Sequence, residues 1–229
     1  MAMNKLPKLN LRDRAVLMKT PLISGLAPSV QARMLELAMP GTFAARGIIF
    51  REGTEAEHLY CILSGYVRLF RLGRDGREAD IRICGPGDVF AECMLTMGPR
   101  HRYSAQAAEN VTVARFDLQK MRMLVEREKE VARALMQVTA NNLLSTMECV
   151  ANDRLQTAPQ RVAHYLLANC PPEGSEISIR LPFQKSLLAG KLGLAPEALS
   201  RAFSTLKPAG VTVRGRLIQI HDVSALKQI

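Results

Sequence analysis

The chain has 229 residues, of which 48% are hydrophobic and 23% charged, an ordinary composition for a soluble globular protein of one large or two modest domains. Its formal net charge of +10 favours an anionic partner such as nucleic acid or a lipid surface. No apolar run reaches the roughly 20 residues of a membrane span, and residues 1–19 lack the apolar core of a signal peptide. We therefore expect a cytoplasmic protein with no membrane segment.

The first half of the sequence predicts a short helix followed by many short strands. Pro28–Leu37 has the apolar spacing of a helix, and β-rich runs separated by glycine turns extend from about Phe43 to Phe116. Asp75-Gly76 predicts a hairpin because both residues tolerate positive φ. Regularly spaced short strands are typical of an antiparallel β-roll, so we assign residues 1–117 to a double-stranded β-helix, or jelly roll.

A long helix is predicted over 118–155, which contains neither proline nor glycine. Its apolar residues recur at spacings of four, three, four and three, as in a coiled-coil seam. This seam consists of Met136, Ala140, Leu143, Met147 and Val150. The stripe could instead cover the β-domain, but such a long helix exceeds what one small domain covers. We favour a parallel dimer, with residues 118–156 as the dimerisation helix.

Residues 157–229 predict a winged helix-turn-helix. A hinge at 157–159 leads into a helix over 161–168, a loop over 171–174 and a strand over 176–181. Two helices joined by a glycine turn at Gly193 follow, and the second begins with Pro196 and runs to about Leu206. Strands at 211–213 and 217–220 form the wing. From residue 160 onward the chain has nine basic and four acidic residues, a balance of 9 − 4 = +5.

The second helix of the pair carries the candidate DNA-reading face. Glu197, Ser200 and Arg201 lie three and four residues apart, so they share one face near the helix N-terminus. A carboxylate can accept a hydrogen bond from cytosine, and Arg can bind guanine through two hydrogen bonds in the major groove. The alternative is an exposed helix on which Glu197 and Arg201 form an ion pair.

The order of β-roll, long helix and winged helix-turn-helix resembles the Crp/Fnr superfamily of bacterial transcription regulators. The resemblance extends over almost the whole chain from about Pro21, and the segments that carry it are 46–53, 63–67, 85–92, 161–167 and 197–201. It implies an α+β fold and a homodimeric DNA-binding regulator, an activator with RNA polymerase as its protein partner. No nucleophile–base pair, metal-ligand spacing or nucleotide loop appears, so we expect no enzyme and no metal site.

Within the superfamily, the Glu-x-x-Ser-Arg arrangement resembles the fumarate-nitrate-reduction branch. That branch reads TTGAT half-sites in an inverted repeat, so the resemblance implies a similar palindrome. It also implies that Lys185, just before the first helix of the pair, contacts a phosphate. Arg214 and Arg216 at the wing tip are further candidates for phosphate contact, although a solvated turn needs no such role.

The predicted effector pocket departs from the cyclic-nucleotide pattern. Members that bind cyclic nucleotides use a Gly-Glu pair, followed about ten residues later by Arg and a small hydroxyl residue. Here the pair is Ala91-Glu92, and Tyr103 separates the arginines from Ser104. Cyclic nucleotide therefore stays an alternative only. The expected pocket residues are Ala91, Glu92, Arg100, His101 and Arg102.

Other effectors follow from other branches. The cysteines are Cys61, Cys84, Cys93, Cys149 and Cys170, and since none precedes Cys61, an N-terminal iron–sulfur cluster is excluded. We interpret them mainly as buried thiols.

Segments 90–97 and 103–107 resemble the dissimilatory nitrate respiration regulators, which respond to nitric oxide through haem. Candidate axial ligands are His58, His101, His164 and the methionines, but Lys191 stands where some of those members have histidine. The remaining alternatives are another small molecule, no ligand, or a ligand-binding regulatory subunit of a partner protein.

Overall fold

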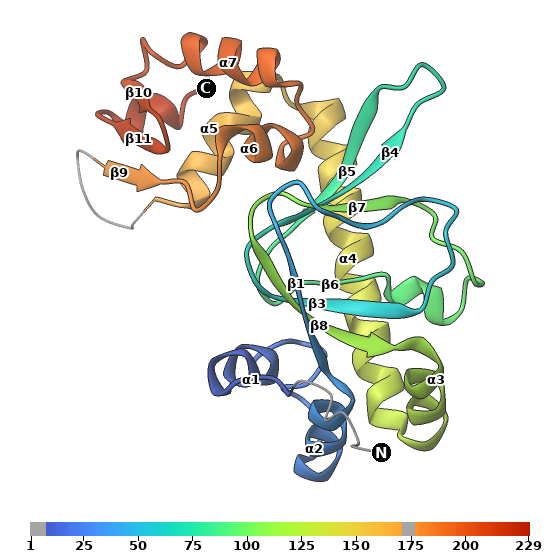
Figure 1. The fold of residues 1–229 in the computed structure, drawn as a ribbon. Coiled ribbons are helices and arrows are strands. Elements are labelled where there is room, and N and C mark those ends of the chain that lie inside the picture. Colours follow the sequence, from blue (N-terminus) through green and yellow to red (C-terminus); the bar gives the residue numbers. More distant parts are fainter. Residues whose placement is uncertain (1–7, 171–176) are drawn as a thin grey trace. The chain divides into compact units, whose positions relative to one another are not determined.

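The computed structural model describes residues 8–170 and 177–229, and the predicted loop at 171–174 lies outside them. The chain divides into two compact units, residues 1–144 and 145–229, and we describe each by itself. Figure 1 shows the elements of both units in chain order. The N-terminal unit includes α3 and the first part of α4 together with the β-roll, so it extends beyond the predicted sensor domain.

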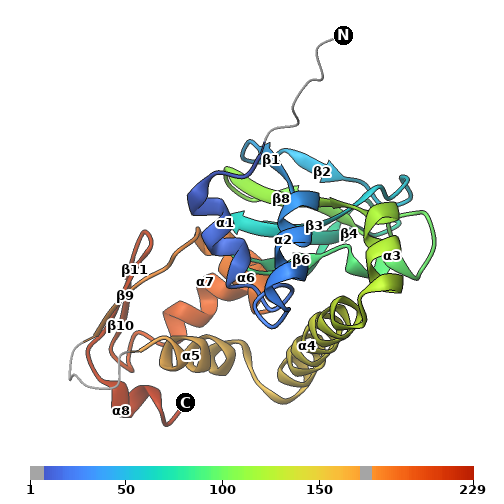
Figure 2. The same cartoon turned by 90° about the horizontal axis from the view of Figure 1, so that it is seen from below.

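Two four-stranded antiparallel sheets form the β-roll. Figure 2 shows the roll from below. Their strand orders are β1-β8-β3-β6 and β2-β7-β4-β5. The first sheet consists of β1 (Met39–Phe43), β3 (His58–Ser64), β6 (Val89–Phe90) and β8 (Val111–Asp117). The second consists of β2 (Ile48–Phe50), β4 (Val67–Leu72), β5 (Glu78–Cys84) and β7 (Ser104–Ala107). The predicted jelly-roll class is confirmed.

Two parts of the β-roll show where local sequence signals predicted the structure and where they did not. The β4–β5 hairpin forms as predicted, but among its turn residues only Gly76 has positive φ, at +76°. Strand β1 was not predicted because Met39–Phe43 contains Pro40 and Gly41. Since β1 lies at the edge of its sheet, a proline without an N–H is tolerated there.

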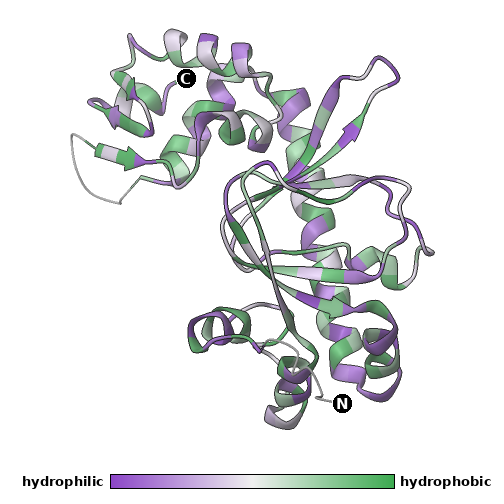
Figure 3. Cartoon of the chain, viewed as in Figure 1, coloured by the Kyte–Doolittle hydropathy of each residue, from purple (hydrophilic) through white to green (hydrophobic). Residues whose placement is uncertain are grey.

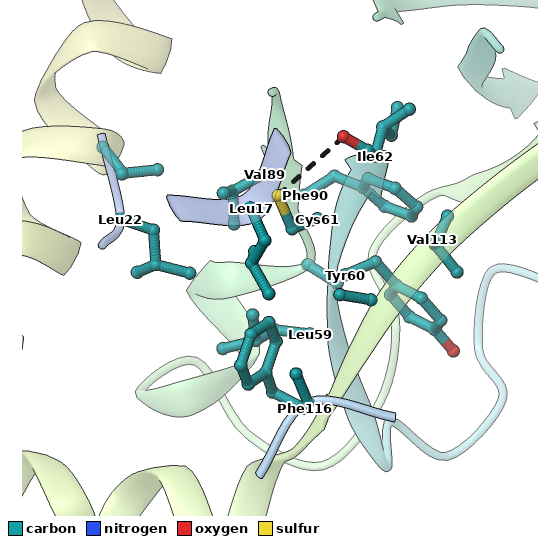
Figure 4. Close-up of a cluster of buried hydrophobic side chains, with 14 of the residues drawn as sticks. Leu17, Leu22, Leu59, Tyr60, Cys61, Ile62, Val89, Phe90, Val113 and Phe116 are labelled. Atoms are coloured by element: carbon teal, nitrogen blue, oxygen red, sulfur yellow. Dashed lines mark hydrogen bonds between the residues drawn. The ribbon is translucent and has the colours of Figure 1, made fainter. Parts of the chain in front are cut away.

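The core of the N-terminal unit lies inside the roll and beneath two helices, α1 (Leu11–Met18) and α2 (Pro28–Leu37). Helix α2 was predicted, whereas α1 was not. Figure 4 shows Leu17 and Leu22 pointing toward Leu59 and Cys61 of β3. Burial raises the pKa of the Cys61 thiol to about 12, so this cysteine is an inert core residue.

The prediction of one continuous helix over residues 118–155 is wrong. The helix is interrupted at Glu128, which separates α3 (Leu118–Arg127) from α4 (Lys129–Leu155). Glu128 has φ −119° and ψ 95°, and its carboxylate forms an ion pair with Arg33 of α2. The buried residues of α3 and of α4 belong to the same core as those of the roll.

Helix α4 has two distinct apolar faces. Apolar and polar residues alternate along the helix in the hydropathy colours of Figure 3. One face is buried in the core of the N-terminal unit and consists of Val131, Ala134, Leu135 and Val138. The other is the predicted seam, all five of whose residues are exposed. Its four larger side chains range from 65% exposed for Met136 to 47% for Val150. The residues that cover the roll are therefore not the seam residues.

Within its described residues, the C-terminal unit contains a three-stranded antiparallel sheet and four short helices besides the end of α4. The sheet, in order β10-β11-β9, consists of β9 (Ile177–Arg180), β10 (Val211–Arg214) and β11 (Leu217–Ile220). The helices are α5 (Ala158–Ala168), α6 (Lys185–Lys191), α7 (Pro196–Thr205) and α8 (Val223–Leu226). The winged helix-turn-helix prediction is confirmed.

The joint between α4 and α5 is shorter than the predicted hinge at 157–159. Only Gln156 and Thr157 lie between the helices, and Pro159 is already in the first turn of α5. Thr157 caps α5 through a reciprocal pair of hydrogen bonds with Gln160. Among the helices of the described residues, none combines the length and hydropathy of a bilayer span.

Candidate functional site

Helix α7 presents the predicted reading face to solvent. Its buried residues are Leu199, Ala202 and Phe203, which fix the rotation of the helix against the unit. Glu197, Ser200 and Arg201 are consequently exposed. In this unit the salt bridge that the structure shows joins Arg161 to Asp153, and none joins Glu197 to Arg201. The alternative of an internal ion pair on α7 is therefore not observed.

A hollow of about 320 Å³ lies beside this face and joins α6, α7 and β10. Its floor is apolar and its rim is polar, and it brings two of the predicted residues, Lys185 and Ser200, to one surface. Lys185 is exposed at the first position of α6. The lining residues are Lys185, Ser186, Pro196, Leu199, Ser200, Phe203 and Val213.

The two wing arginines differ. Arg214 ends β10 and is exposed, as predicted. Arg216 is instead attached to the chain, since its Nε donates to the Leu181 carbonyl at 3.0 Å and its Nη2 donates to the Pro182 carbonyl at 2.6 Å. Arg216 is also exposed, but these two bonds hold it to the segment between β9 and α6, so a phosphate contact by Arg216 stays a prediction.

In the β-roll, Ala91 keeps a backbone conformation that normally requires glycine. It precedes the short 3₁₀ helix η1 (Glu92–Leu95) and has φ 62° and ψ 14°, in the left-handed region. Its N–H donates to the Tyr103 hydroxyl at 3.0 Å. The donor that could have bound an anionic ligand is thus already occupied by a side chain of the same unit.

Glu92 is also engaged within the N-terminal unit. Asn142 of α4 donates from Nδ2 to Glu92 Oε1 at 2.6 Å and to the Val89 carbonyl at 3.4 Å. These two bonds connect α4 to β6 and to η1. A ligand that needed the Glu92 carboxylate would have to displace Asn142 from it.

The other three predicted pocket residues lie on the segment that leads into β7. Arg100 donates from Nη1 to the Gly53 carbonyl at 2.8 Å, and Arg102 is exposed. His101 is only 3% exposed and stacks on Phe50 with a centroid distance of 3.6 Å. Burial lowers the pKa of His101 to about 4, so its imidazole is neutral at physiological pH. Four of the five predicted pocket residues therefore have contacts within the N-terminal unit, and Arg102 is exposed.

Two family models match the chain. The "Cyclic nucleotide-binding domain" matches residues 40–128, and the "Crp-like helix-turn-helix domain" matches residues 160–229. The first match falls on the roll and the second on the winged helix-turn-helix. The chain is a Crp/Fnr family regulator. It is a DNA-binding transcription regulator with an effector-type domain.

Named relatives of this regulator are themselves regulators and not enzymes. A CRP-like cAMP-activated global transcriptional regulator of Mycobacterium tuberculosis is 27% identical over 92% of this chain and 96% of its own length. The nitrogen fixation regulation protein FixK of Azorhizobium caulinodans is 28% identical over 84% of this chain and 79% of its own. The structure of FixK2 from Bradyrhizobium japonicum has a TM-score of 0.69 and 28% identity, covering 83% and 96%.

The resemblance to nitric-oxide-responsive members raises the question whether the regulator can hold haem. A macrocycle needs an open apolar slot beside its axial ligand. The space next to His101 contains Phe50, and the rings of Tyr60, Phe90 and Tyr103 lie within 6.0 Å of Phe50, centroid to centroid. His58 begins β3, and His164 is exposed on α5. The stack of Phe50 on His101 leaves no open slot for haem on that side of the imidazole, and we assign no step to haem.

Three functionally placed residues were missed by sequence reasoning. Asn142 contacts Glu92, Tyr103 occupies the Ala91 N–H, and Arg161 contacts the turn between α6 and α7. A polar asparagine within the apolar pattern of α4 was the available signal for Asn142. The other two contacts join residues whose proximity only the fold determines.

Proposed function

We propose that the regulator binds, as a homodimer, to DNA sites made of two TTGAT-type half-sites in inverted orientation. The observation that carries this proposal is the exposed face of Glu197, Ser200 and Arg201 on α7, which has no salt bridge within the described unit. Side chains near the N-terminus of a recognition helix are those that reach base edges in the major groove. The neighbouring Lys185 supplies positive charge for a phosphate.

The exposed seam of α4 supports the homodimer. Five apolar residues at coiled-coil spacing cover none of the roll, and water-exposed apolar stripes of this kind favour association with a second helix. A two-fold dimer would place its recognition helices about 34 Å apart, which matches two half-sites one helical turn apart. We infer that the bound dimer acts on transcription through RNA polymerase.

We propose further that the effector of the β-roll is a small molecule. We do not expect it to be a cyclic nucleotide bound through the backbone N–H of Ala91 and the carboxylate of Glu92. Two observations support this: the Ala91 N–H already binds Tyr103, and the Glu92 carboxylate already binds Asn142. An effector that displaces Asn142 would act directly on α4.

The test is DNA binding by the full chain, measured by fluorescence anisotropy on a duplex of about 30 base pairs carrying the palindrome. Arg201→Ala should lower affinity by roughly 1–3 kcal/mol and abolish discrimination at one guanine. Lys185→Ala should weaken binding to all sequences. It should also reduce the slope of log affinity against log salt concentration, the salt slope, by about 1. Arg154→Ala, an exposed arginine on α4, is the matched control.

Two outcomes would contradict the proposal. If Arg201→Ala protects the same site with unchanged affinity, α7 is not the reading helix. If the wild-type chain retards no palindromic duplex, a regulatory subunit that binds a partner protein becomes the better explanation.

A further inference from the structure

Arg161 connects three segments of the C-terminal unit. Its Nη1 donates to Asp153 Oδ1 at 2.6 Å, to the Leu192 carbonyl at 3.0 Å and, at the limit of hydrogen-bond length, to the Gly193 carbonyl at 3.5 Å. Asp153 lies in the last turn of α4, and Arg161 lies in α5. Leu192 and Gly193 form the turn between α6 and α7. One guanidinium therefore joins the end of α4 to the turn of the helix-turn-helix.

The Arg161 side chain is mostly buried against the turn between α6 and α7. The Arg161 side chain is only 12% exposed, whereas that of Asp153 is 59% exposed. Gly193 has φ +63°, and a Cβ on it would lie 3.4 Å from Arg161 Nη1, so the guanidinium packs directly on the turn backbone. Hydrogen bonds from a cation to carbonyl and carboxylate oxygens are stronger than those between neutral groups. The turn carbonyls are therefore held by charge as well as by packing.

The turn determines where the reading helix begins. Ala195, two residues after Gly193, is the N-cap residue of α7, and it has no side-chain hydrogen bond to the helix. With no such cap, the start of α7 depends on the turn that precedes it and on the packing of Leu199 and Phe203. Any displacement of the turn carbonyls relative to α4 thus shifts the N-terminal end of α7, where Glu197 lies.

We propose that Arg161 is a positioning residue for DNA recognition, which fixes the α6–α7 turn to the last turn of α4. It acts through Leu192 and Gly193 and not by touching DNA. The inference rests on the proposed function of α7 and adds a residue outside the reading face. It also provides a direct path by which a shift at the end of α4 reaches the reading helix.

The experiment compares Arg161→Gln, Asp153→Asn and the double variant in the full chain, with Arg154→Gln as the matched control. Dissociation constants are measured on the palindromic duplex and on a scrambled duplex, over a range of salt concentrations. Arg161→Gln should raise the dissociation constant for the palindrome about tenfold, while scrambled DNA changes less than about twofold. Asp153→Asn should cause a loss of about threefold. The double variant should be no worse than Arg161→Gln, because both changes remove one link.

The salt slope separates positioning from direct contact. A positioning residue leaves the slope unchanged, whereas a phosphate contact lowers it by about 1 and weakens both duplexes equally. That second pattern, or wild-type affinity and specificity in Arg161→Gln, would overturn the inference. A lower melting temperature with unchanged specificity would also overturn it, since the role would then be structural only.

If Arg161→Gln does not fold, Asp153→Asn decides the question, because Asp153 is largely exposed. Wild-type affinity for the palindrome in Asp153→Asn would then sink the link between α4 and the turn. If the wild-type chain does not distinguish the palindrome from scrambled DNA, the proposed function has failed and not this inference.

Discussion

The two candidate sites of this regulator differ in how their polar groups are used. On α7, Glu197, Ser200 and Arg201 face solvent, so DNA would replace only water. In the β-roll, the Ala91 N–H and the Glu92 carboxylate already have protein partners. Breaking an internal hydrogen bond opposes ligand binding, because both of its groups must be satisfied again elsewhere. A motif can therefore keep its backbone shape while its binding groups serve the fold.

The largest effect is expected at the seam of α4, because α7 reads a palindrome only as one of a pair. Leu143→Glu places an unpaired charge in the predicted dimer interface and should raise the dimer dissociation constant at least about 100-fold. Since Leu143 is 60% exposed within the chain, the change costs the monomer less than about 0.5 kcal/mol. Sedimentation velocity measures the dimer.

The matched control for the seam is Asn141→Glu, at the neighbouring exposed position of α4. It should leave the dimer intact. Equal association of Leu143→Glu and wild type would show that the exposed stripe of α4 is not the dimer interface.

A second effect concerns the buried side of the comparison. Burial lowers the pKa of His101 from an ordinary 6.5 to about 4. The unfolded chain therefore takes up this proton first, and the free energy of unfolding falls as pH drops from 6.5 toward 4, by about 3 kcal/mol at pH 4. Urea unfolding at several pH values measures the change.

His101→Phe preserves a ring on Phe50 and should remove this part of the pH dependence. The contribution of His101 is the difference between the wild-type and His101→Phe curves, because other groups titrate in both. Parallel curves would mean that His101 has the same pKa in the folded and the unfolded chain, so that burial does not perturb it.

The smallest effect sharpens the comparison at Ala91. A left-handed backbone costs an L residue roughly 1 kcal/mol, so Ala91→Gly should stabilise the roll by up to about 1 kcal/mol. Part of this gain is lost because glycine raises the conformational entropy of the unfolded chain. Ala107→Gly, at a buried position of β7, should instead destabilise it. Thermal unfolding measures both.

Cyclic AMP should still not bind to Ala91→Gly in titration calorimetry, since Tyr103 and Asn142 keep their contacts. Binding by this variant would show that only the glycine was missing, and the roll would then resemble α7 in offering an available site.

Local signals in the sequence predicted much of the fold. The glycine of the β4–β5 turn, Pro196 at the start of α7 and the apolar spacing of α2 were enough, because each acts within a few residues. Met39–Phe43 was missed because its pairing with β8, and not its composition, makes it a strand. The break at Glu128 was missed because the stabilising partner, Arg33, is 95 residues away.

The same division applies to the candidate site. The exposed face of α7 follows from helical period alone, so Glu197, Ser200 and Arg201 could be placed in advance. The hydrogen-bond partners of these side chains could not be predicted. Arg216 donates to carbonyls 34 and 35 residues away, and Asn142 donates to Glu92, which is 50 residues away. Such contacts are decided by how elements pack, which a single sequence does not state.

The anchoring of α4 at its first turn has a mechanical consequence. Glu128 just before the helix pairs with Arg33, and Glu130 accepts a hydrogen bond from the Ala27 N–H at 2.8 Å, so α2 holds this end. With 27 residues, α4 is about 40 Å long. As a lever fixed at one end, a tilt of about 5° displaces its far end by about 3.5 Å over that length. A displacement of about one base-pair step, roughly 3.4 Å, thus follows from a small rotation of the helix.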